Sequence, residues 1–108
     1  MTSDDDSDWK LKLRYGKTST PFQHATLLAV GYMDQARHDY GVDQGPAVMA
    51  AKIWSISDLD AVEIVAQVGR DIGFRITGNI EIYRTDPEEP PIDKPSVYGV
   101  NFTPFSEE

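Results

Sequence analysis

The segment SDLDAVEIVAQVGRDIGF, residues 57–74, carries the pattern of an amphipathic helix from its first residue to its last. Ser57 is a favourable N-cap residue, and Asp60 stands at the position that closes a capping box. Acidic residues fall in the first turn and Arg70 near the end, as the helix dipole favours. Gly73 ends the helix as a C′ residue, so the helix spans Ser57 to Ile72. Its expected apolar stripe consists of Leu59, Val62, Val65, Ala66, Gly69 and Ile72.

Segments with a period of two surround this helix and predict strands. Before the helix, residues 9–15 alternate without a fault, residues 22–33 are apolar on both faces, and residues 47–56 alternate again. After it come a strand of up to eleven residues that starts at Phe74, and a last strand over 98–103. One amphipathic helix covers one face of such a sheet. We therefore predict an α+β fold, an antiparallel sheet of four to five strands with one helix packed on one face, in the order β-β-β-α-β-β.

The irregular segments have their own patterns. Residues 34–46 are polar and contain Gly and Pro, which predicts a long loop, with a short helical turn at 33–38 as the alternative. Gly78 falls on the apolar face of its strand, which indicates either a β-bulge or a close approach of the helix. Residues 86–91 contain three prolines and predict an extended, polyproline-like connection.

Length and charge favour one domain of 9–105, flanked by acidic tails at 1–8 and 106–108. The chain has 108 residues and a net charge of −8, which argues against an ordinary basic nucleic-acid binder. Six carboxylates lie in the two tails, and removing them from the 18 acidic residues leaves 12 against 10 basic residues. We expect the tails to be disordered and to aid solubility.

The composition also bears on the compartment. No apolar run approaches the roughly 20 residues that a membrane span needs, and no charged-then-apolar leader precedes a cleavage site. The absence of cysteine excludes disulfides and thiolate chemistry and agrees with a reducing environment. We therefore expect a cytoplasmic protein without a membrane role.

No pattern in the sequence predicts catalysis. His24 lies on the second predicted strand, where a lone histidine is usually a hydrogen-bonded structural residue. His38 lies beside Asp34, Asp39 and Asp43, but calcium loops need denser oxygen ligands and zinc sites need more nitrogen or sulfur. A Gly-x-Ser-x-Gly turn, a catalytic cysteine and a phosphate-binding loop are all absent. We predict no catalytic residue, no cofactor and no metal site, and hence not an enzyme.

The first candidate surface is a basic row of Lys10, Lys12 and Arg14 on one face of the strand predicted at 9–15. A stripe of this kind can bind phosphate backbones or anionic partners. The alternative is structural, because lysines also keep an exposed strand soluble and protect a sheet edge from aggregation.

The second candidate surface combines two polar loops. Asp39, Tyr40 and Asp43 come from the loop at 34–46, and Glu88 and Glu89 come from the proline-rich connection. Loops on a rigid scaffold often carry recognition residues, and an exposed tyrosine is a frequent interface anchor.

Five segments together resemble a family of small, single-domain bacterial proteins of unknown function. They are WKLKLRYG at 9–16, TPF at 20–22, IGF at 72–74, GNIEIYRTDP at 78–87 and NFTPF at 101–105. The resemblance covers most of the chain and implies a bacterial or phage setting. It supplies no activity, cofactor or binding residue.

These observations favour a non-enzymatic, acidic protein-binding module, in its concrete form an inhibitor of a basic partner of the immunity or anti-defence type. The alternative is a nucleic-acid- or anion-binding accessory protein that uses the basic row. A third hypothesis is a small-molecule binder or enzyme with a pocket between helix and sheet. We expect the second face of the sheet to be covered by the proline-rich connection and C-terminal segment, by a second copy in a homodimer, or by both.

Overall fold

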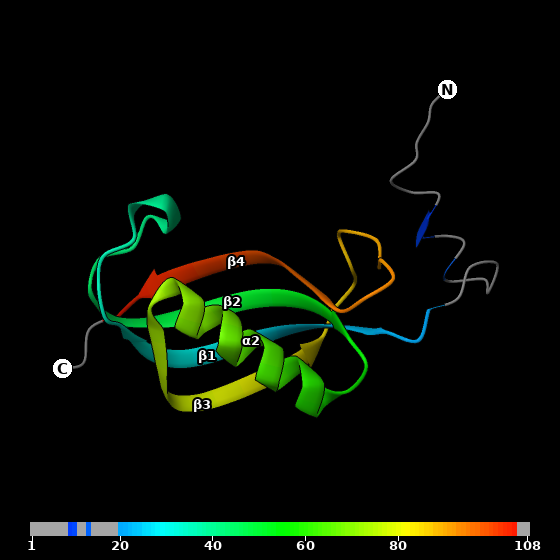
Figure 1. Cartoon of the computed structure of the whole chain (residues 1–108), viewed down its shortest axis with the longest axis horizontal. Coiled ribbons are helices and arrows are strands. Elements are labelled where there is room, and N and C mark those ends of the chain that lie inside the picture. Colours follow the sequence, from blue (N-terminus) through cyan, green and yellow to red (C-terminus); the bar gives the residue numbers. More distant parts are fainter. Residues whose placement is uncertain (1–8, 11–12, 14–19, 106–108) are drawn as a thin grey trace, which may run out of the picture.

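Residues 20–105 fold into one four-stranded antiparallel sheet with one α-helix lying across one of its faces (Figure 1). The structure is a computed structural model that describes residues 9–10, 13 and 20–105. The sheet order is β3-β1-β2-β4. The elements are β1 (Gln23–Met33), η1 (His38–Tyr40), β2 (Gly45–Ser55), α2 (Asp58–Ile72), β3 (Phe74–Arg84) and β4 (Ser96–Pro104). The predicted α+β class and the single helix on one face are confirmed, with a sheet of four strands.

The strand predicted at 9–15 is wrong where the structure describes this segment. Trp9, Lys10 and Leu13 are helical, and the other residues of the segment lie outside the described part of the chain. One helical turn places residues four apart on the same side. Trp9 and Leu13, four residues apart, both line a hollow with Trp54, although the period-two alternation of the segment favours a strand. The order of the described strands and α-helix in residues 20–105 is therefore β-β-α-β-β.

Both predicted ends of the helix α2 are confirmed. The Ser57 hydroxyl oxygen accepts a hydrogen bond from the backbone N–H of Asp60 at 3.1 Å. Gly73 adopts a φ of 106°, and its backbone N–H donates to the carbonyl oxygens of Gly69 and Arg70. Only glycine adopts this left-handed conformation without a Cβ penalty, so the helix stops here and the chain turns into β3.

The predicted apolar stripe is only partly correct. Leu59 is 69% exposed, because it lies two residues from Ala61 and hence on the opposite side of the helix. The stripe that the structure buries steps by three or four residues along the other side. It consists of Ala61, Val65, Gly69 and Ile72.

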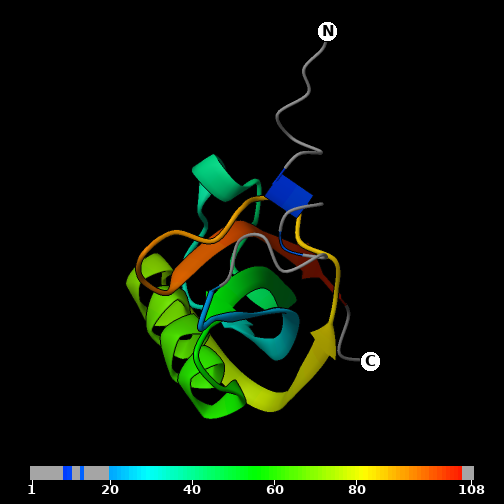
Figure 2. The same ribbon diagram turned by 90° about the vertical axis from the view of Figure 1, so that its right-hand side faces the viewer.

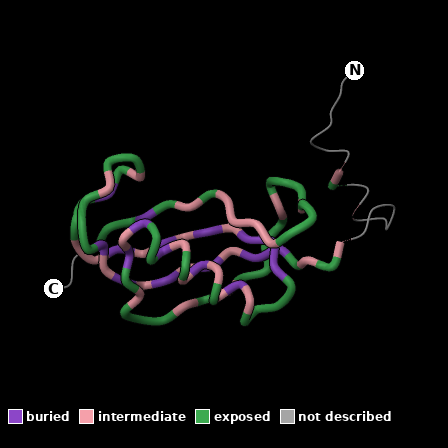
Figure 3. Tube along the Cα trace, viewed as in Figure 1, coloured by how far each residue is buried: buried purple, intermediate pink, exposed green. Residues whose placement is uncertain are grey.

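The main core lies between α2 and the sheet. Along β1 and β2, buried residues alternate with half-buried ones, as the purple and pink segments of the tube show (Figure 3). Burying each large side chain contributes about 1.5–3 kcal/mol. The largest fully buried side chains are Phe74, Leu27, Met33, Met49, Ile53 and Val65. The alternation of residues 47–56 puts Met49 and Ile53 on one face of β2, and the structure buries both against the helix side.

The β1–β2 connection is an ordered hairpin loop with the short helical turn η1 at its tip. The loop does contain a short helical turn, as the alternative predicted, but the turn begins at His38 and does not cover 33–38. The Asp34 backbone N–H donates to the Gly73 carbonyl at 2.9 Å, and Arg37 donates from its Nη1 to the Ile72 carbonyl at 2.6 Å. The loop therefore satisfies carbonyl groups at the C-terminal end of α2, which a helix leaves without partners of its own.

Both edge strands contain an irregularity. In β3, the register against β1 shifts between Ala29 and Gly31, opposite the segment that contains Gly78. A Cβ at Gly78 would lie 3.1 Å from the Val30 side chain, on the face away from α2. The predicted bulge at Gly78 is confirmed, whereas the alternative of a close approach by the helix is wrong.

The irregularity in β4 lies at Gly99, which has a φ of 64°. Tyr98 pairs with Lys52, while Phe102 pairs with Met49, so the two aromatic residues of β4 lie on opposite faces of the sheet. Simple alternation along 98–103 predicts Tyr98 and Phe102 on the same face. This expectation is wrong, because the bulge adds a residue to one strand only.

Candidate functional site

The face of the sheet away from α2 is apolar at its centre and remains half-exposed. Leu28 pairs with Ala50, and Val30 pairs with Val48, across the two central strands. All four side chains are half-buried, whereas their neighbours on the helix side are fully buried. Within residues 20–105, the α-helix lies on the other side of the sheet (Figures 1 and 2). We call Leu28, Val30, Tyr32, Val48 and Ala50 the open face.

Aromatic and charged side chains border the open face. The guanidinium of Arg75 lies 5.4 Å from the ring centroid of Tyr32 and pairs with Asp34 at 2.8 Å. On β3, Tyr83 is 48% exposed, and its hydroxyl donates to the Glu81 carboxylate. The hydrogen bond to this carboxylate raises the pKa of Tyr83. Tyrosine and arginine are enriched at protein–protein interfaces, and an apolar centre with a polar rim is the usual arrangement there.

One end of the same face holds a buried polar cluster around His24. The imidazole is 7% exposed; its Nδ1 lies 2.9 Å from the Thr85 carbonyl oxygen, and its Nε2 lies 2.6 Å from the Tyr98 hydroxyl. The Tyr98 oxygen also accepts from the backbone N–H groups of Glu88 at 2.9 Å and Glu89 at 3.4 Å. These bonds join β1 and β4 to the proline-rich connection.

The protonation of His24 follows from its partners. A carbonyl oxygen only accepts, so Nδ1 carries the hydrogen, and a neutral ring then accepts at Nε2 from the Tyr98 hydroxyl. Burial lowers the pKa of His24 below 6.5, and the nearby Lys52 lowers it further, against the hydrogen bond to Thr85. The imidazole is therefore neutral at pH 7, which agrees with a structural role.

Trp54 completes the cluster. Its ring packs edge-on against His24 at a centroid distance of 5.0 Å, and its indole N–H donates to the Glu89 carbonyl at 2.8 Å. Lys52 lies 3.4 Å from the Glu88 carboxylate. The proline-rich connection is thus tied to one end of the sheet, as expected for part of the cover of this face.

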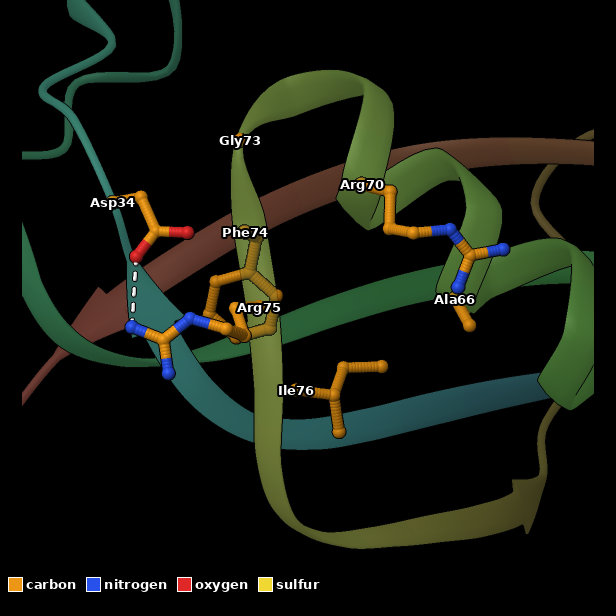
Figure 4. A pocket seen from close by; sticks show the side chains of 7 residues that line it. All are labelled: Asp34, Ala66, Arg70, Gly73, Phe74, Arg75 and Ile76. Atoms are coloured by element: carbon orange, nitrogen blue, oxygen red, sulfur yellow. Dashed lines mark hydrogen bonds and ion pairs between the residues drawn. The ribbon is translucent and has the colours of Figure 1, made fainter.

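A separate hollow lies between α2 and the start of β3, with a cavity volume of about 510 Å³ (Figure 4). Phe74 and Ile76 form apolar walls, and Arg70 and Arg75 lie on opposite sides with their guanidinium groups pointing away from each other. Arg75 is already engaged by Asp34. Neither histidine lines the hollow, and its carboxylate, Asp34, is paired with Arg75. The third hypothesis of a small-molecule binder or enzyme stays a prediction.

The predicted loop residues are arranged differently from the expectation. Asp39 is exposed and accepts from Arg37, and this hydrogen bond lowers the pKa of Asp39. Asp43 is exposed as well. Tyr40, expected to be exposed, is half-buried, with its ring 5.6 Å from that of Phe102. The three residues therefore do not form one exposed patch, because Tyr40 covers the core at the β4 edge.

The other predicted surface residues divide in two. Glu88 and Glu89 are exposed and hold the His24 cluster through their backbones. Lys10 is helical, with its ammonium 5.7 Å from the Trp9 ring, and Lys12 and Arg14 lie outside the described residues. At Lys10, the prediction that the basic row lies on a strand face is therefore wrong.

Comparison with known proteins adds no relative. No family model matches the chain, and no curated protein or solved structure does either. Within the described residues, histidines and carboxylates form no group of three that could hold a metal ion. A helix able to cross a membrane is also missing from the part of the chain that the structure describes. The resemblance to small bacterial proteins remains a prediction.

Proposed function

We propose that this chain is a non-enzymatic protein-binding module that docks a basic protein partner through the open face. The observation that carries the proposal is the half-exposed apolar centre of Leu28, Val30, Val48 and Ala50. Contiguous apolar surface with a polar rim marks interaction sites in soluble proteins. The net charge of −8 favours a basic partner, because complementary charge speeds association and suppresses wrong partners.

The edges of the sheet support docking on the face rather than by strand addition. Bulges interrupt β3 near Gly78 and β4 at Gly99, and β4 ends at Pro104. Bulges and prolines on edge strands oppose pairing with another strand. A partner therefore gains more contact from the continuous central strands β1 and β2 than from either edge.

The experiment is affinity capture from a bacterial lysate with matched variants. Val48→Glu places a charge in the centre of the open face, whereas Gln44→Glu adds the same charge at an exposed position in the β1–β2 loop. We expect Gln44→Glu and the unchanged chain to retain the same stoichiometric protein after nuclease treatment. Val48→Glu should reduce the captured amount at least about tenfold, because it buries an unpaired charge at the contact.

Thermal unfolding of both variants shows whether each remains folded. Equal capture by a folded Val48→Glu variant would show that the partner does not use the open face. Captured material that disappears after nuclease treatment would instead favour the nucleic-acid-binding alternative. Capture that weakens with rising salt supports a basic protein partner, since salt screens charge attraction.

A further inference from the structure

The connection from Thr85 to Pro95, which we call the 85–95 segment, is held to the sheet mainly through the side chains of His24, Tyr98 and Trp54. Its Thr85 carbonyl accepts from His24, its Glu88 and Glu89 N–H groups donate to Tyr98, and its Glu89 carbonyl accepts from Trp54. An ion pair between Lys52 and Glu88 and a hydrogen bond between the Thr26 and Thr85 hydroxyls add to these contacts. We propose that protonation of His24 releases the 85–95 segment from the sheet and uncovers part of Trp54.

In the resting state, every hydrogen bond between His24, Tyr98 and the 85–95 segment has one donor and one acceptor. With the hydrogen on Nδ1, the neutral His24 ring donates to Thr85 and accepts from the Tyr98 hydroxyl. The phenol uses its only hydrogen toward His24, so both lone pairs of its oxygen are free. Glu88 and Glu89 donate their backbone N–H groups to that oxygen.

A proton on Nε2 makes this arrangement impossible. The charged ring carries hydrogen on both nitrogens and donates on both sides. The Tyr98 oxygen would then face three donors, His24, Glu88 and Glu89, with two lone pairs, and its own hydrogen would need a new acceptor. At least one of the three donors then loses its place on the Tyr98 oxygen. The N–H groups of Glu88 and Glu89 lie at the exposed side of the cluster and can turn to water, whereas the His24 ring is buried, so we expect the segment to give way.

The charged groups around the His24 ring influence how readily it takes up a proton. Lys52 on β2 disfavours a positive His24, whereas Asp86 and Glu88 in the 85–95 segment favour it. Burial is the largest effect, so the pKa of His24 lies below 6.5 while the segment is in place. Release exposes the ring to water and lets its pKa rise, so protonation and release promote each other.

The expected consequence is a larger open face in acid. Trp54 is 4% exposed, and it pairs with His24 across β1 and β2 on the same side of the sheet as the open face. Release of the 85–95 segment removes the acceptor of the indole N–H and the part of the surroundings of Trp54 that Asp86 and Pro87 supply. Trp9 and Leu13 line the other side of the same hollow. This consequence rests on the proposed function, whereas the release itself concerns the isolated chain.

NMR spectroscopy of the chain without a partner tests the release. The chain has two histidines, so His38→Gln leaves His24 as its only imidazole to titrate. Protection factors against hydrogen exchange are measured for the Trp54 indole N–H and the Glu88 and Glu89 amides between about pH 7.5 and about pH 5. These protection factors should fall by up to about tenfold for each pH unit below 6.5, until the pH reaches the pKa of His24 in the folded chain. The Val65 amide in α2 should keep its protection.

Two further variants make the test decisive. Adding His24→Gln should remove the pH dependence, because Gln can donate to Thr85 and accept from Tyr98 but takes up no proton in this range. Tyr98→Phe should leave the Glu88 and Glu89 amides unprotected throughout. Unchanged protection in the His38→Gln chain as His24 titrates, or an equal fall after His24→Gln, would overturn the proposal. Partner capture plays no part here, so neither result bears on the docking proposal.

Discussion

The imidazole of His24 and the hydroxyl of Tyr98 meet at 2.6 Å although their strands, β1 and β4, are not neighbours in the sheet. Strand β2 lies between them, and the contact passes over its face beside Trp54. Two features make the contact: the bulge at Gly99, which turns Tyr98 away from the helix side, and the 85–95 segment, which closes over it. His24 and Tyr98, together with the bond from Trp54 to Glu89, therefore tie this end of the sheet to the 85–95 segment.

Acid should destabilise the fold through His24. Because its pKa lies below 6.5 in the folded chain, the unfolded chain binds more protons between 6.5 and that lower value. The contribution of His24 to the free energy of unfolding is complete above pH 6.5, declines as the pH falls to the folded pKa, and is constant below it. Urea unfolding at a series of pH values measures this decline.

The carboxylates of the chain add their own pH dependence, so the comparison is with His24→Gln. The free energy of unfolding of the unchanged chain should fall relative to that of His24→Gln as the pH drops below 6.5, because only the unchanged chain contains the imidazole of His24. A difference that stays constant over this range would show that the fold does not lower the pKa of His24.

Tyr98→Phe should lower the free energy of unfolding by about 1–2 kcal/mol, because it removes a hydroxyl that serves His24 and two backbone N–H groups. Tyr83→Phe is the matched control, since it removes a hydroxyl that bonds only to the exposed Glu81 among the described residues. Chemical denaturation at pH 7 measures both. Equal effects would mean that the Tyr98 hydroxyl makes no special contribution.

Two Gly→Ala substitutions should act in opposite directions. A Cβ at Gly31 would lie 2.3 Å from the Arg75 carbonyl oxygen, so Gly31→Ala should destabilise the fold by about 1–3 kcal/mol. At Gly69 the nearest atom would lie at 3.4 Å, so Gly69→Ala should stabilise α2 by about 0.5–1 kcal/mol. Thermal unfolding distinguishes them, and destabilisation by Gly69→Ala would mean that the helix lies closer to the sheet than described.

Ser57→Ala should cost about 1 kcal/mol, because it removes the oxygen that caps the Asp60 N–H at the start of α2. Ser57→Asn should keep most of the stability, because asparagine caps as well as serine. Denaturation curves of both variants provide the measurement. A loss of the same size in both would show that the cap is not the cause.

The helix ends and the sharing of one face by Met49 and Ile53 could be predicted because their patterns are local. Ser57 and Gly73 act on backbone groups within four residues, and alternation assigns Met49 and Ile53 to one side of a strand regardless of the rest. The segment at 9–15 shows the limit of the method. Its alternation favours a strand, and the hollow that Trp9 and Leu13 line together with Trp54 is not visible in the sequence.

The sequence by itself determined the α+β class, the ends of the helix and the apolar character of both faces of the central strands, because backbone capping and side-chain periodicity depend on near neighbours. Only the tertiary structure decided the sheet order, the face on which Tyr98 lies and the closure of the 85–95 segment over His24. These features depend on which distant backbone groups pair, and a single bulge at Gly99 reverses a face that alternation had assigned.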